Sequence, residues 1–182
     1  MKYINKLTYC SYDGFMEMDN LRNNYDSVLE LDCKDITTED KFWFYFGLYF
    51  NFPTLVDNWA AFSDWMRDLA FWDRNKSILI IFKNVDELFC RNLTLQSLAM
   101  SVFWEEVLPY WENEVIKVTS GSMQPRQFDV YCVMSQYDDV NDTLRMYKND
   151  DIRMYNFDCI TDTIVEVITT CNTYTLLTVH LL

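Results

Sequence analysis

The side chains best suited to chemistry are carboxylates spaced along one stretch of the chain. Asp57, Asp64 and Asp68 fall, together with Ala61, at intervals that place them on one face of an α-helix. A rigid helix that carries carboxylates on one face displays negative charge to a cationic partner. Alternatively, Asp64 and the more distant Glu105 could form the carboxylate pair that a hydrolase uses.

Other kinds of site find little support in the sequence. The single histidine, His180, and six cysteines without a CxxC pair do not have the clustering that a zinc site needs. We therefore expect no metal and no cofactor, and we expect mostly buried, reduced thiols. No nucleophile motif or phosphate-binding loop accompanies the carboxylates, so the chain is not expected to be an enzyme.

Charge and hydrophobicity indicate the kind of partner and compartment. The 182 residues include 28 acids and 15 bases, a formal net charge of −13, and half of them are hydrophobic. Such a field repels nucleic acid and anionic membranes and attracts basic proteins, and the hydrophobic fraction is ample for a core. No signal-peptide pattern and no apolar run of membrane-spanning length is present, so a soluble, cytoplasmic protein is expected. No oligomeric state is predicted.

The acidic stretch is predicted to be a helix over residues 57–71, with Thr54 or Asp57 as its N-cap. Its opposite face is apolar, because the helical period also aligns a second set of side chains: Trp59, Phe62, Met66 and Leu69. This face is expected to pack on the core and to fix the direction in which the carboxylates point.

The surrounding pattern predicts a small α/β domain. Apolar runs indicate strands at residues 28–31, 77–82 and 128–134. The run at 41–52 indicates a buried helix, and residues 88–111 indicate one or two helices. This order predicts a three-stranded, mostly parallel sheet with helices packed on it.

Two helix ends and two extensions complete the predicted organisation. Thr37 or Thr38 is expected to cap the first helix, Pro53 to end it, and Pro109 to kink or end the later one. Residues 1–26 are predicted to be an extension that forms a short hairpin around the turn-like Asp13-Gly14. Residues 136–182 are predicted to be a β-rich extension with a terminal hairpin that extends the sheet or pairs with the N-terminal segment.

Three stretches follow one another in the middle of the chain: FPTLVDNWAAFSDWMRDL, then SILIIF with KNVDELF, then FDVYCVMS. In this order they resemble the barstar family, the small intracellular inhibitors of secreted ribonucleases, over roughly residues 27–135. The residues that match the family's helix pattern are Pro53, Asn58, Ala61, Phe62, Asp64 and Leu69. The resemblance implies a barstar-like fold.

The resemblance also implies roles for the carboxylates. In the family, acids on this helix and a glutamate on the last helix fill the ribonuclease active site in place of RNA phosphates. By that comparison Asp64 is the central contact, flanked by Asp57 and Asp68, and Glu105 is the distant glutamate. Independently, an acid such as Asp57 is also expected in a first helical turn for dipole reasons alone.

Three further residues are candidates for the partner-binding surface. Asn58 is expected to hold the preceding loop by hydrogen bonds. Ser63 stands where the best-known family member has a tryptophan. Trp65 lies at the edge of the apolar stripe and could anchor a partner.

The resemblance therefore predicts an immunity protein, or antitoxin, that inhibits a basic ribonuclease toxin. The alternative is an interaction module with the barstar fold and a different, non-nuclease partner. Two features favour the alternative. The first is a change in the family's motif: residues 54–57 stand where the family has two aromatics and a glycine, and Ala60 replaces the first acid of the family's run. The second feature is the C-terminal extension.

Overall fold

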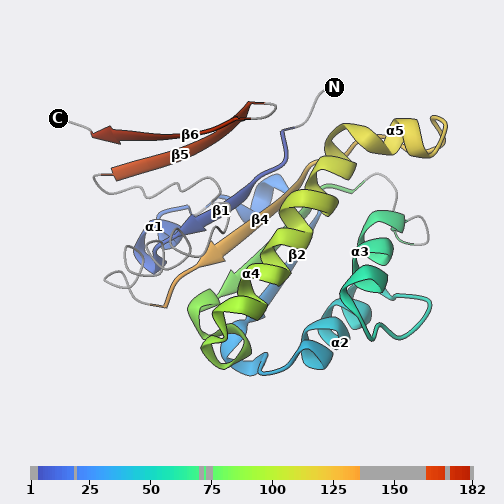
Figure 1. Cartoon of the computed structure of the whole chain (residues 1–182), viewed down its shortest axis with the longest axis horizontal. Helices are drawn as coiled ribbons and strands as arrows, with labels where there is room; N and C mark the ends of the chain where they lie inside the picture. Colours follow the sequence, from blue (N-terminus) through green and yellow to red (C-terminus); the bar gives the residue numbers. More distant parts are fainter. Residues whose placement is uncertain are drawn as a thin grey trace.

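The computed structural model describes residues 4–18, 20–69, 72 and 76–135, together with the backbone of two strands at 163–170 and 173–180. Four parallel strands form the main sheet, in the order β1-β4-β3-β2 (Figure 1). Their bounds are β1 Leu7–Cys10, β2 Ser27–Asp32, β3 Ile78–Lys83 and β4 Phe128–Val133. The three predicted strands and the predicted parallel sheet are confirmed, and β1 is an additional fourth strand.

The N-terminal residues do not form the predicted hairpin. β1 pairs in parallel with β4, with Leu7 opposite Val130, and the short helix α1 (Tyr12–Met16) follows it. Gly14 donates its N–H to the Ser11 side chain at 3.1 Å, so the expected turn residues lie inside a capped helix. A hairpin would need a local antiparallel partner, whereas β4 provides a distant parallel one. The division into residues 1–26, 27–135 and 136–182 stays a prediction.

Two helices follow β2 along the chain. Helix α2 (Glu39–Phe50) begins at Thr38, whose side chain accepts from the N–H of Lys41, as predicted. It ends at Asn51, which takes a left-handed conformation with φ of 54°, so it stops two residues before Pro53. Helix α3 (Trp59–Asp68) is the predicted acidic helix, though it is shorter than predicted.

One continuous helix runs from residue 93 to residue 118. It consists of α4 (Leu93–Ser101), the π-helical η4 (Val102–Val107) and η5 (Tyr110–Glu114), and α5 (Val115–Val118). Pro109 lies between the two π-helical stretches, so it does not end the helix. A proline lacks the N–H of the α-helical pattern and crowds the carbonyl four residues earlier, and the wider π-turns accommodate both effects. Short 3₁₀ segments complete the described fold: η1 Arg22–Asn24, η2 Cys33–Asp35 and η3 Val85–Arg91.

The sheet is covered on both faces, because alternate side chains of its strands enter two different clusters. Ile78, Ile80 and Phe82 of β3 face the large core under α2, α3 and the long helix. Leu79 and Ile81 face the smaller cluster that contains α1. Figure 1 shows α2, α3 and α4 on the side opposite α1. The predicted burial of the aromatic helix is confirmed, since α2 contributes Phe42, Phe46 and Phe50 to the large core.

The C-terminal strands are β5 (Thr163–Thr170) and β6 (Thr173–His180), which pair antiparallel as a two-stranded sheet. The predicted hairpin is confirmed, but the four-stranded sheet does not include it. The polar stretch at 136–151, where the sequence suggests a boundary, lies outside the described residues.

Four cysteines lie in the described part of the chain, and all four are free thiols. Cys10, Cys33 and Cys132 are buried, whereas Cys90 is exposed. Burial raises the pKa of the Cys33 and Cys132 thiols well above the usual value, so both stay protonated. The predicted burial of the thiols is therefore confirmed at Cys10, Cys33 and Cys132 but not at Cys90. Cys159 and Cys171 lie outside the described residues.

Candidate functional site

The acidic helix α3 begins at Asn58, not at Thr54 or Asp57 as predicted. Asn58 has extended backbone angles, and its Oδ1 accepts the N–H of Ala61 at 2.8 Å. Its Nδ2 donates to the Asp57 carboxylate at 2.7 Å. Asp57 therefore lies in the loop before the helix and does not share the helical face of Asp64. Asn58 connects the two segments.

Replacing the cap should destabilise the protein without touching its core. We expect Asn58→Ala to lower the free energy of unfolding by about 1 kcal/mol, because the Ala61 N–H loses its acceptor. Urea denaturation measures this loss. Asn58→Asp keeps an oxygen acceptor and should stay within about 0.5 kcal/mol of wild type. If both variants lost the same free energy of unfolding, the side-chain oxygen of Asn58 would not be stabilising the helix as an N-cap.

The apolar face of α3 fixes its orientation. Phe62, Met66 and Leu69 are fully buried, as the helical period predicted. Trp111 of the long helix donates its Nε1–H to the Met66 carbonyl at 2.8 Å. Trp59 is half-buried, and its Nε1–H donates to the Glu39 carboxylate at the start of α2. The helix is therefore attached to two neighbours and presents its other face outward.

That outward face carries Asp64 and Asp68, both exposed, and the Asp64 side chain is 74% accessible. Asp64 is also ion-paired, because Arg67 Nη2 lies 2.7 Å from its Oδ1. The same Nη2 lies 3.9 Å from Oε2 of Glu106 on η4. We call these four residues, Asp64, Arg67, Asp68 and Glu106, the α3 acidic cluster.

Glu106 and Arg67 were not predicted as site residues. The Arg67 pairing could have been read from its position three residues after Asp64. The side of the helix on which Glu106 lies could not have been predicted from the sequence. Its segment η4 is π-helical, and each π-turn shifts the faces of the helix relative to an α-helical wheel. The predicted Glu105 is exposed on the same segment.

Ser63 does not lie on the surface. It is 1% exposed, and its hydroxyl donates to the Glu106 carboxylate. A direct contact with a partner, as the sequence suggested, is thus not available to this side chain. Ser63 lies next to Phe62, at the border of the buried face of α3. Its hydrogen bond holds Glu106 against this helix.

Trp65 is partly buried instead of projecting as an exposed anchor. Its Nε1–H donates to the Thr54 hydroxyl at 3.2 Å, and its ring stacks on Phe52 with centroids 6.3 Å apart. These contacts hold the loop at 52–58 beside α3. Leu55, at the tip of this loop, is 94% exposed.

The electrostatics of the cluster extend to Tyr110. Burial and the nearby Asp68 charge raise the pKa of the Tyr110 hydroxyl, although Arg67 and Arg126 oppose the shift. Tyr110 therefore stays neutral, and the charge of the α3 acidic cluster comes from its three carboxylates and the Arg67 guanidinium. Such an arrangement can attract the positively charged surface of a protein partner.

The described residues contain neither a metal-ligand cluster nor a membrane-spanning helix. No group of three or more His, Cys, Asp or Glu side chains suited to holding a metal ion occurs among them. In the same residues, no helix has the length and apolar character needed to cross a membrane.

Comparison with known proteins relates the middle of the chain to a known family. A family model described as Barstar (barnase inhibitor) matches residues 27–120, a span of 94 of the 182 residues. The matched span includes β2, α2, α3, β3 and the whole long helix. No curated protein matched the chain.

Proposed function

The chain belongs to the barstar (barnase inhibitor) family, and on that basis we propose that it binds and blocks a basic ribonuclease. The observation that carries this proposal is the exposed Asp64 carboxylate on α3, a helix anchored to the core by Phe62 and Met66. A ribonuclease active site is cationic because it binds phosphate. Carboxylates on a preformed support can occupy it with little ordering cost.

The positions of the exposed carboxylates support a contact surface on α3 and η4. Asp64 is its centre, Asp68 and Glu106 flank it, and Glu105 extends it along η4. Asp57 contributes at the edge, through the loop that Asn58 holds. We propose that the protein acts in the cytoplasm as an immunity protein or antitoxin and has no catalytic activity of its own.

The direct experiment uses barnase as the probe. The purified full chain is titrated into barnase while cleavage of a fluorogenic oligoribonucleotide is followed. Stoichiometric loss of cleavage supports the proposal. Undiminished cleavage by barnase and by a panel of other basic ribonucleases, at micromolar inhibitor, would overturn it.

A second candidate is an interaction module of the same family with a non-nuclease partner. The loop at 54–57 favours it, because an exposed Leu55 stands in a loop where the family has two aromatics and a glycine. Arg67 also reduces the net negative charge of the α3 acidic cluster. A module of this kind would form a complex with a basic protein that has no ribonuclease activity.

Arg67 gives a test of how the cluster works. We expect Arg67→Gln to raise the association rate with barnase about two- to fivefold at low salt, since it removes a positive charge beside Asp64. Stopped-flow fluorescence measures the rate. Arg67→Lys retains the charge and should leave the rate near wild type. A slower Arg67→Gln variant would mean that the guanidinium positions the carboxylates productively.

A further inference from the structure

The strand β2 has an open side. It is the last strand of the four-stranded sheet and pairs only with β3 there, with Leu29 opposite Ile80. Among the described residues no strand covers its other side. The backbone N–H and C=O groups of such an edge can pair with an added strand.

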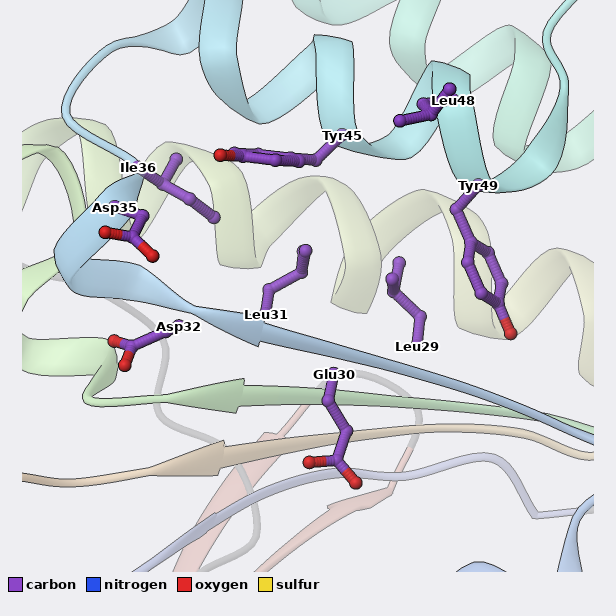
Figure 2. Close-up of a pocket in the computed structure, with 9 residues that line it drawn as sticks. All are labelled: Leu29, Glu30, Leu31, Asp32, Asp35, Ile36, Tyr45, Leu48 and Tyr49. Atoms are coloured by element: carbon purple, nitrogen blue, oxygen red, sulfur yellow. The ribbon is translucent and has the colours of Figure 1, made fainter.

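A hollow of about 350 Å³ lies along this edge, between β2 and α2. Leu29 and Leu31 point from the strand toward α2, Tyr49 projects from α2 toward the strand, and Tyr45 extends toward Ile36 and Asp35 (Figure 2). Leu48, which is 69% exposed, completes this apolar wall. A strand added to β2 would direct every second side chain into the hollow.

Carboxylates near the carboxyl end of β2 give this end of the edge a negative charge. The Glu30 side chain leaves β2 on the side opposite Leu29 and Leu31 (Figure 2) and is already paired with Arg22 and Lys83. Asp32, at the carboxyl end of β2, accepts from the Asn84 side chain at 2.9 Å.

Asp35 follows closely and also lines the hollow. Lys41 Nζ lies nearby, 3.3 Å from the Asp35 backbone oxygen. Two carboxylates, Asp32 and Asp35, thus stand where an incoming strand would end, in a chain with a net charge of −13.

We propose that this edge binds an extended segment of another protein by strand addition. The segment has apolar side chains at alternate positions, which fill the hollow, and a lysine or arginine at the end that meets Asp32 and Asp35. Main-chain hydrogen bonds supply affinity, and the hollow and the two carboxylates supply selectivity. The residues that line the site belong to β2, to α2 and to the segment between them and include none of the α3 acidic cluster, so the site does not depend on the proposed ribonuclease inhibition.

A second copy of the chain fits this edge poorly. If two β2 strands paired antiparallel, Glu30 and Asp32 of both copies would project from the same face of the joined sheet. Like charges on adjacent strands are destabilising. A basic segment from a different protein avoids that repulsion.

The test selects ligands from a displayed library of random ten-residue peptides, with the full chain as bait. We expect enriched peptides that alternate apolar residues and carry a basic end. Backbone amide shifts in the NMR spectrum should then concentrate at residues 27–36. Methylation of alternate backbone nitrogens of the peptide that face β2 should abolish binding.

Matched variants decide the location. Leu48→Lys should weaken the selected peptides at least about tenfold, because it places a charge at the apolar hollow. Phe44→Lys lies one turn earlier on α2, is similarly exposed at 60%, and does not line this hollow, so binding should stay within about twofold. Inhibition of barnase should be unchanged in both variants, so the two proposals fail separately.

Three results would overturn the proposal. One is the absence of any enriched peptide. The second is binding that Phe44→Lys weakens as much as Leu48→Lys does, which would place the ligand in the hollow between α2 and the loop at 52–56, because both residues line that hollow. The third is a dimer in sedimentation that Leu48→Lys dissociates, which would make a second copy the occupant.

Discussion

Replacing Asp64 with alanine is expected to weaken barnase binding by about 2–5 kcal/mol, roughly 30- to 4,000-fold in Kd. The carboxylate is exposed in the free protein and would be buried against cationic groups in the complex. Its loss leaves those cations without a partner. It also leaves the Arg67 guanidinium with only its longer ion pair to Glu106, facing a positively charged active site. Surface plasmon resonance at several salt concentrations measures both affinity and association rate.

One further variant tests whether binding needs the charge or only the shape of the Asp64 side chain. Another compares the centre of the proposed contact surface with its edge. Asp64→Asn keeps the size of the side chain and should lose nearly as much affinity, since the charge is what binds. Asp57→Ala should change Kd by less than about threefold, because Asp57 precedes the helix and is engaged by Asn58. If all three variants bind barnase as the wild type does, α3 is not the contact surface and the proposed mechanism fails.

The sheet strands that were predicted from sequence are those with local signals. The run around Ile78 to Phe82 is apolar at every position, as a strand buried on both faces must be. β1 has only four residues, and its partner β4 lies more than 100 residues away along the chain. A parallel pairing over that distance leaves no turn signal, so the nearby Asp13-Gly14 suggested a hairpin instead.

The part of the candidate site that lies on one helix, α3, could be predicted from the sequence. The period of α3 placed Asp64 and Asp68 opposite Phe62 and Met66, and the structure keeps that separation. Contacts between helices were not predictable, because they depend on side-chain register across the core. Glu106 reaches Ser63 and Arg67 only because the long helix passes through π-turns beside α3.

The helix can display its carboxylates only if its opposite face remains packed, and Phe62 tests this dependence. The ring is fully buried and lies 5.4 Å from Phe42, 5.1 Å from Phe46 and 5.8 Å from Phe103, measured between centroids. Phe62→Ala is expected to lower the free energy of unfolding by about 3–5 kcal/mol, through lost burial and the cavity left behind. Urea denaturation followed by circular dichroism measures the change.

Phe44→Ala is the matched control, since the same side chain is removed from an exposed position of α2, and its effect should stay within about 0.5 kcal/mol. A loss below about 1 kcal/mol for Phe62→Ala would contradict the packing described for α3. The milder Phe62→Leu keeps the protein folded for binding measurements. Saturating barnase should raise its unfolding midpoint as it does for wild type, because the ligand binds only the folded state. Asp64→Ala should gain far less from barnase, although its own stability is nearly unchanged. The core residue and the surface residue of α3 thus separate folding from binding within one helix.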